Sequence, residues 1–263
     1  GIESILSNAN YHLAISIMSD SDLKQLNFPQ TISDSSIKGI ILVEICDKVV
    51  CDALSQFNLP IVSVDMPNVP FEELNGIDVV TMESKKNLKK IINQLIEKGA
   101  ESFGFVGDLY SPNVSRGFQE RYNALSECLA EHQLPLNQKN CLLHQTPEDF
   151  RNFQTTVNNL QAMISLPDVF ICGNDWTAIQ LIYALQFLGF QIPKDICVVG
   201  FDNIPAASRI SPSLTTISTP QKYLGIAAAR QILERIQHPN CPHVFCQYET
   251  ELIIRNSTNI TSF

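Results

Sequence analysis

The sequence predicts an α/β protein in which parallel sheets are covered by helices. Apolar runs of four to seven residues, rich in β-branched and aromatic side chains, recur along the chain between turn formers. Such runs are typical of strands that are buried on both faces, as in parallel sheets. Helical periodicity follows most of them, and this alternation is the pattern of βαβ units. A chain of 263 residues is long enough for two lobes.

The same patterns predict the individual elements. The helix predicted over 84–99 has Ser84 at its start and Gly99 at its end, which are residues favoured at helix caps. Because the chain opens inside a helix, we expect that a preceding strand is missing and that the chain is a fragment of a longer protein. The predicted strands are 11–18, 39–45, 61–65, 102–108, 168–174, 196–202 and 248–255, and the predicted helices are 2–10, 49–57, 84–99, 119–134, 175–190 and 221–237.

Charge and hydropathy exclude several classes of partner. Lys and Arg number 18 against 27 Asp and Glu, which gives a formal net charge of −9. A surface of that sign repels DNA phosphates and anionic lipid, so this chain by itself is not expected to bind nucleic acid. No apolar stretch approaches the ~20 residues that span a bilayer, and the first residues have no features of a secretion signal. We therefore expect no membrane association.

The eight cysteines favour a reducing compartment. Cys172 and Cys197 fall inside predicted buried strands, where a free thiol behaves as a small apolar group. We therefore expect a cytoplasmic protein. The segment 238–246 holds two histidines and two cysteines, but their spacing matches no standard zinc pattern, so we interpret it as a linker. No metal or other cofactor is expected.

Four apolar runs end on an acidic residue, and this places carboxylates where a ligand would bind. The four residues are Asp65, Asp108, Asp175 and Asp202. In open α/β sheets the ligand crevice lies just beyond the carboxyl ends of the strands. Carboxylates there suit a ligand that is rich in hydroxyl or amine donors, and they oppose a phosphate. Phosphate-binding, dinucleotide and nucleophile-elbow motifs are absent from the sequence, so we expect no catalytic residues and no enzyme.

Several segments resemble the effector-binding domain of the LacI/GalR family of bacterial transcription regulators. The most specific is the stretch from Pro193 to Ile236, which contains VGFD and PSLTTI; supporting segments are ICGNDWTAIQLIYALQFLGFQIP, RYNALSECLAEHQLP and GIESILSNANYHLAI. The resemblance implies two Rossmann-like lobes of the periplasmic-binding-protein-like type I fold, joined by a hinge of crossing segments. It also implies a homodimer, with an amino-terminal helix-turn-helix headpiece, absent from this chain, that binds operator DNA.

The expected lobes follow from this fold. The amino-terminal lobe is expected to comprise 1–100 and about 220–240, because the helix after Pro220 comes after the strands of the second lobe. The carboxy-terminal lobe is expected to comprise 101–219 and about 241–263. The effector is expected to lie between the lobes.

The resemblance also implies which residues contact the effector. Asp202 is expected to accept hydrogen bonds from adjacent hydroxyls, Asn174 to make polar contacts, and Arg121 to hold sugar oxygens or a carboxylate. Asp65 corresponds to a strand-tip position that some members use. Asp175 is a further candidate, with the alternative that it caps the following helix.

Trp176 is the last candidate contact, and the sequence departs from the family pattern at several positions. Trp176 is the only tryptophan, and it is either a platform for a sugar face or a core or lobe-surface residue. Ala124 and Leu125 follow Arg121 where the family has glycine and an aromatic residue, Met66 stands where an aromatic residue often lies, and Thr219 replaces a frequent glutamine.

These inferences predict the ligand-sensing domain of a bacterial transcriptional regulator, which we expect to be a repressor. The domain is expected to bind a small effector, most often a sugar in this family, and to control operator binding. The alternative is a transport-linked, periplasmic-type sugar-binding protein with the same architecture. An upstream helix-turn-helix would favour the regulator, and an upstream signal peptide would favour the transport protein.

Overall fold

The computed structural model describes residues 1–109, 115–143 and 152–260. These residues form two compact units, and each contains its own sheet. Unit 1 comprises 1–83 and 220–249 with a short piece at Ser115 and Arg116, and unit 2 comprises the described residues of 84–109, 117–219 and 250–260. The chain therefore passes from one unit to the other at 83–84, 219–220 and 249–250.

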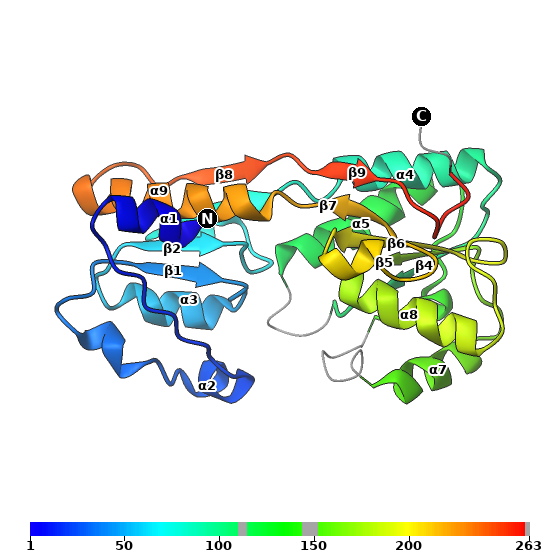
Figure 1. The fold of residues 1–263 in the computed structure, drawn as a ribbon, viewed down its shortest axis with the longest axis horizontal. Coiled ribbons are helices and arrows are strands. Elements are labelled where there is room, and N and C mark those ends of the chain that lie inside the picture. Colours follow the sequence, from blue (N-terminus) through cyan, green and yellow to red (C-terminus); the bar gives the residue numbers. More distant parts are fainter. Residues whose placement is uncertain (110–114, 144–151, 261–263) are drawn as a thin grey trace. The chain divides into compact units, whose positions relative to one another are not determined.

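Unit 1 is built on a four-stranded sheet in which all neighbouring strands are parallel. The order is β1 (Ile40–Val43), β2 (Ile61–Val64), β3 (Ile77–Met82) and β8 (Phe245–Tyr248). Helices α1 (Ile2–Asn8) and α9 (Gln221–Gln237) lie on one side of this sheet and α3 (Lys48–Ser55) on the other (Figure 1). The unit also contains α2 (Asp20–Gln25), η1 (Gln30–Ser33) and η2 (Phe71–Glu73).

The alternation of side chains along the strands of unit 1 divides its core into two halves. Ile61 packs with the α3 residues, whereas its neighbour Val62 packs with α9. Successive strand residues point to opposite faces, so a strand covered by helices on both sides is apolar at most positions. Ile61, Val62 and Val64 follow this pattern, and the buried Ser63 satisfies its hydroxyl by donating to the carbonyl oxygen of Asp65 at 2.7 Å.

Unit 2 contains a five-stranded sheet. Its order is β4 (Phe103–Val106), β5 (Val169–Cys172), β6 (Cys197–Asp202), β7 (Thr215–Ser218) and β9 (Glu251–Ile253), and only β9 runs antiparallel to its neighbour. Helices α7 and α8 pack on one face of the sheet with Phe170 and Val198. The remaining elements are α4 (Lys86–Glu97), α5 (Arg116–Glu131), α7 (Phe153–Gln161), α8 (Asp175–Phe187), η3 (Gln138–Asn140) and η4 (Pro205–Ser208).

Two predictions about strands are wrong. Residues 11–18 form no strand, and Ile15 and Ile17 are 80% and 95% exposed. The alternation of apolar residues there is suitable for a strand, but a strand also needs a hydrogen-bonding neighbour, and β1 pairs within the described sheet only with β2. The single strand predicted over 248–255 is two strands, β8 and β9, which pair with β3 in unit 1 and β7 in unit 2.

The units also differ from the expected lobes at three points, of which the first is Ser115 and Arg116, expected with 101–219 but found in unit 1. The α4 helix, expected with 1–100, belongs to unit 2, where Lys89 forms a 2.7 Å ion pair with Glu127 of α5. The β8 strand, expected with 101–219, belongs to unit 1 because its backbone pairs with β3. Within the described residues, no helix is long and apolar enough to cross a membrane.

A buried ion pair organises the segment that joins α9 to β8. Arg235 of α9 donates from Nε to Oδ2 of Asp78 at 3.0 Å and from Nη2 to Oδ1 at 2.8 Å. Asp78 is fully buried and Arg235 is 5% exposed. The backbone N–H of Val244 donates to Asp78 Oδ1 at 2.8 Å, so the carboxylate also fixes the start of β8.

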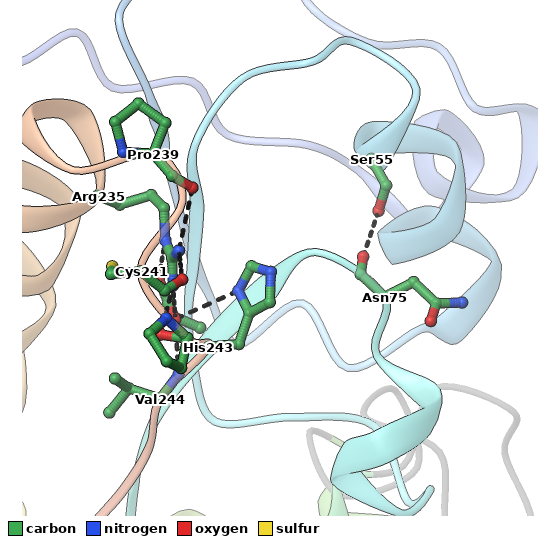
Figure 2. A network of polar contacts seen from close by, with 9 residues as sticks. Ser55, Asn75, Arg235, Pro239, Cys241, His243 and Val244 are labelled. Atoms are coloured by element: carbon green, nitrogen blue, oxygen red, sulfur yellow. Dashed lines mark hydrogen bonds and ion pairs between the residues drawn. The ribbon is translucent and has the colours of Figure 1, made fainter.

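The same arginine holds the segment that was interpreted as a linker. Its guanidinium donates to the carbonyl oxygens of Pro239, Cys241 and Pro242 (Figure 2). Nδ1 of His243 lies 3.4 Å from Asp78 Oδ1. In the same view, Ser55 Oγ of α3 donates to the carbonyl oxygen of Asn75, just before β3. The segment is therefore a bound connection and not a free linker.

Replacing Arg235 by Met should lower the free energy of unfolding by about 3–5 kcal/mol, because the substitution leaves a buried carboxylate without its counter-charge. Urea denaturation would measure this. Arg230→Met, at an exposed position of the same helix, is the control and should change stability by only about 0.5 kcal/mol or less. A loss of under about 1 kcal/mol for Arg235→Met would contradict this account of the pair.

The pH dependence of that difference has a defined sign. Burial by itself raises the pKa of Asp78, but the hydrogen bonds from Arg235 and Val244 outweigh it and hold the pKa below its ordinary value. The ionised carboxylate therefore stabilises the fold above the ordinary aspartate pKa of about 4, and this contribution is lost as the pH falls through the lowered pKa. The difference between the wild type and Arg235→Met should shrink on acidification.

Candidate functional site

The carboxyl ends of four parallel strands in unit 2 bring several polar residues to one edge of the sheet. Val106 of β4 pairs with Cys172 of β5, and Ile171 of β5 pairs with Val199 of β6. Continuing this register beyond the strand ends brings Asn174 level with Asp202. Asp202 in turn pairs with Ser218 of β7. The edge is therefore lined by residues that the sequence analysis selected from separate parts of the chain.

Asn174 lies between β5 and α8 and caps the helix. Its Oδ1 accepts hydrogen bonds from the backbone N–H of Thr177 at 3.0 Å and from Thr177 Oγ1 at 2.8 Å. An N-cap asparagine uses its oxygen in this way. The Nδ2 group of Asn174 has no hydrogen-bond partner among the described residues. The cap therefore orients the side chain and leaves its two N–H donors for another acceptor.

Asp175 is the first residue of α8, and its carboxylate points into unit 2. Oδ1 accepts from Thr216 Oγ1 of β7 at 2.6 Å, and Oδ2 accepts from the backbone N–H of Ile204 at 2.9 Å. The residue is fully buried. Burial raises the pKa of Asp175 above the ordinary aspartate value, although the hydrogen bonds from Thr216 and Ile204 act in the opposite direction. Asp175 therefore joins three segments, and both of its oxygens already have protein partners.

Gly200 makes room for this carboxylate. A Cβ atom at position 200 would lie 2.2 Å from Asp175 Oδ1 and 2.8 Å from a methyl group of Leu214. Real Cβ contacts are essentially never shorter than 3.0 Å. The glycine in the VVGFD motif is thus required by the close approach of Asp175 to β6.

Asp202 is the last residue of β6 and begins a left-handed turn. Its φ is 114°, and that of Asn203 is 57°. Residues other than glycine seldom adopt positive φ, and asparagine and aspartate are the most tolerant of it. Thr219, after β7, donates from Oγ1 to the carbonyl oxygen of Asp202 at 3.3 Å. The turn places Asp202 at the carboxyl end of the strand, where the sequence predicted it.

Arg121 of α5 approaches the same edge from below the strands. The side chain is 3% exposed, and Nη1 donates to the carbonyl oxygen of Gly173 at 2.7 Å. Its guanidinium carbon lies 3.6 Å from the centre of the Phe201 ring, which is a cation–π contact. The arginine therefore links α5 to the end of β5, one residue before Asn174.

Trp176 and Asp65 are the remaining predicted contacts. Trp176 is 65% exposed in the first turn of α8, so a core position is wrong, whereas the platform role and the alternative of a lobe-surface residue stay predictions. Asp65 belongs to unit 1, where it follows β2 with a φ of 71° and accepts from the N–H of Met66 at 2.8 Å. Met66 is fully buried in the unit 1 core. An effector contact at Asp65 also stays a prediction.

Several residues that hold this edge of the sheet in place were not predicted from the sequence. Asn203 bonds to Ser218 and to Arg255, and Thr216 bonds to Asp175. Arg255 had no local signal, since it is a single charged residue after an apolar strand. No group of three or more His, Cys, Asp or Glu residues that could hold a metal occurs within 1–109, 115–143 and 152–260.

The geometry defines what this edge can bind. It offers a carboxylate at Asp202, which accepts hydrogen bonds, and amide donors at Asn174. A hydroxyl group both donates and accepts hydrogen bonds, so a polyol can bond to the carboxylate and to the amide. Such donors and acceptors suit recognition by hydrogen bonding.

Comparisons with known proteins identify the domain. The family model for the periplasmic binding protein-like domain matches residues 92–258. The chain is 26% identical over 262 residues to the HTH-type transcriptional repressor PurR of Photobacterium profundum, covering 98% of this chain and 75% of that repressor. It is 27% identical to the ribose operon repressor of Haemophilus influenzae, again covering 98% of this chain and 75% of that protein.

A solved structure has the same fold at lower identity. The complex of the transcriptional regulator CelR with cellobiose superposes with a TM-score of 0.82 at 19% identity, and the match covers 97% of this chain and 76% of that one. The fold class expected from the sequence is confirmed. The chain belongs to the periplasmic binding protein-like domain family, in the form found in LacI-type transcriptional regulators.

Proposed function

We propose that this chain is the effector-sensing domain of a LacI-type transcriptional repressor and that it binds a sugar at the carboxyl edge of the unit 2 sheet. The observation that carries the proposal is the pairing of an acceptor with donors at that edge: the carboxylate of Asp202 and the Nδ2 group of Asn174. Adjacent sugar hydroxyls match such a set. Occupancy of the site controls operator DNA binding by the regulator.

The names of relatives support this class of effector. The matched repressors include one named for a ribose operon, and a structural neighbour was solved with cellobiose. The relative PurR has a name that refers to no sugar. Nucleosides and purine bases therefore belong in any ligand panel. Arg121, which is buried and bonded to Gly173, acts by holding the end of β5.

The transport-linked alternative is less well supported. Two relatives of this chain by sequence, from Photobacterium profundum and Haemophilus influenzae, are named as repressors. All eight cysteines, which lie in the described part of the chain, are free thiols, and six of them are buried. Free thiols suit a reducing compartment, so we assign the protein to the cytoplasm. We assign it no catalytic activity, and turnover of a bound sugar would contradict that assignment.

We further propose that the protein is a homodimer that uses α8. Trp176, Tyr183 and Phe187 are 65%, 43% and 67% exposed. Their spacing of seven and four residues places them on one side of the helix. The only charged residue of α8 is Asp175, which is buried, so this aromatic stripe carries no charge. A second copy of the same surface can cover it without charge repulsion, as in a twofold interface.

Asp202→Asn should weaken sugar binding by about 1.5–3 kcal/mol, because a charged hydrogen-bond acceptor is lost. Thermal stabilisation across a panel of pentoses, hexoses, disaccharides, nucleosides and sugar phosphates would first identify the ligand. At a hundred times its Kd, a ligand should add ~2.7 kcal/mol to the stability of the wild type. Titration calorimetry would then compare the variants.

Glu101→Gln is the matched control, since Glu101 is exposed and precedes β4 at the opposite end of the sheet. Its Kd should equal that of the wild type. An unchanged Kd for Asp202→Asn would remove Asp202 from the site. Stabilisation by no sugar in the panel would refute the proposed effector class.

Replacing both Tyr183 and Phe187 by Ser should raise the dimer dissociation constant by about ten-fold or more, because aromatic anchors contribute most of the energy of such interfaces. Sedimentation velocity over a concentration series would measure it. Tyr223→Ser, at a position of α9 that is 64% exposed, is the control. A wild type that sediments as a monomer, or an unchanged constant in the double variant, would contradict the use of α8.

A further inference from the structure

The turn that begins at Asp202 needs support from outside its own strand. Asp202 and Asn203 are consecutive residues with positive φ, at 114° and 57°. Such conformations are unfavourable for residues that carry a Cβ and persist only where the surrounding structure imposes them. The orientation of the Asp202 side chain depends on this backbone, so whatever holds the turn also sets the geometry of the proposed sugar site.

Two side chains hold the turn from opposite sides. From the β5–α8 junction, Asp175 Oδ2 accepts the backbone N–H of Ile204 at 2.9 Å. From the carboxy-terminal segment, Nη2 of Arg255 donates to Asn203 Oδ1 at 2.7 Å. Nδ2 of Asn203 then donates to Ser218 Oγ on β7 at 3.1 Å. Since Arg255 can only donate, it fixes which end of the Asn203 amide faces Ser218.

Arg255 is itself anchored to β7. Nη1 donates to the carbonyl oxygen of Leu214 at 2.8 Å. Its backbone N–H donates to Thr215 Oγ1 at 2.9 Å, and its carbonyl oxygen accepts from the same hydroxyl at 3.1 Å. A planar guanidinium whose Nη1 is already bonded to Leu214 loses little additional freedom when Nη2 bonds Asn203. Arg255 is therefore a rigid link between β7 and the turn at Asn203.

Arg255 also lies close in sequence to a point where the chain passes from one unit to the other. It comes two residues after β9, and β9 follows the point at 249–250 where the chain passes from unit 1 to unit 2. Arg255 therefore connects the segment after β9 to Asn203, the residue next to Asp202.

We propose that Arg255 is a positioning residue for effector recognition, which orients Asp202 by clamping Asn203 and makes no contact with the sugar. The proposal rests on the proposed function. It assigns to the carboxy-terminal segment a part in setting the affinity of the site.

The test uses Arg255→Gln and Asn203→Ala, each alone and combined, with Arg209→Gln as the control. Arg209 is an exposed arginine of unit 2 for which no side-chain contact is present in the described residues. In the ligand-free protein, hydrogen–deuterium exchange of peptides covering 202–206 should become about ten-fold faster in Arg255→Gln, because a clamp of the turn is lost. Exchange in Arg209→Gln should match that of the wild type.

Affinity provides the second readout, with D-ribose and cellobiose as probes. For the sugar that binds the wild type, the Kd should rise about ten-fold in Arg255→Gln. The double variant should bind no more weakly than Asn203→Ala, because both changes remove the same clamp. A purely structural role would instead lower the Tm and leave additive effects on Kd. If Arg255→Gln does not fold, Arg255→Lys keeps the charge and loses the paired donors.

The outcomes separate this inference from the proposed function. Unchanged exchange over 202–206, an unchanged Kd in a protein that binds sugar, or additive effects of the two substitutions would each overturn the role of Arg255. Absence of sugar binding in the wild type refutes the proposed sugar effector, and the exchange measurement then decides the clamp by itself.

Discussion

The carboxylate of Asp175 is the interaction on which the polar edge of unit 2 depends. A buried carboxylate is costly unless donors satisfy it, and here the donors come from two other segments, Thr216 of β7 and Ile204 after β6. Satisfying the charge therefore fixes the end of β5, the turn after β6 and β7 relative to one another. Gly200 is the steric condition for this arrangement, because a side chain there would collide with the carboxylate oxygen. Asn174 and Asp202, the proposed recognition residues, are half-buried at an edge that this buried carboxylate keeps in register.

Unit 1 uses the same physical principle for a different purpose. Asp78, at the start of β3, is also fully buried, and its partner Arg235 comes from α9. That pair binds the segment leading into β8 and so determines where the chain runs after the helix. In each unit one buried aspartate joins elements that are distant in sequence. Breaking either network would leave a charge without compensation, which is why such pairs favour one arrangement of the chain over others.

The predicted site shows how far local patterns reach. Asp202 was selected because it ends an apolar run and Asn174 because the family resemblance implies a polar contact there, and parallel pairing brings both to one edge. Asp175 ends the same run as Asn174, yet its carboxylate is turned inward, since the first residue of a helix points to a different side from its cap. Trp176, one residue further, is exposed on the outer side of α8. Three consecutive residues thus have three different environments that composition cannot distinguish.

The sequence by itself determined the alternation of strands and helices, the burial of the strands and the polar character of their carboxyl ends. These properties arise from periodicity and turn chemistry within a few residues. Only the tertiary structure decided that residues 11–18 lack a strand partner, that β8 and β9 belong to different sheets, and that Arg235 and Arg255 bind Asp78 and Asn203. Those contacts join residues 157 and 52 positions apart. No local pattern encodes such a pairing, because the two residues meet only after the strands between them in the sequence have packed into the sheets.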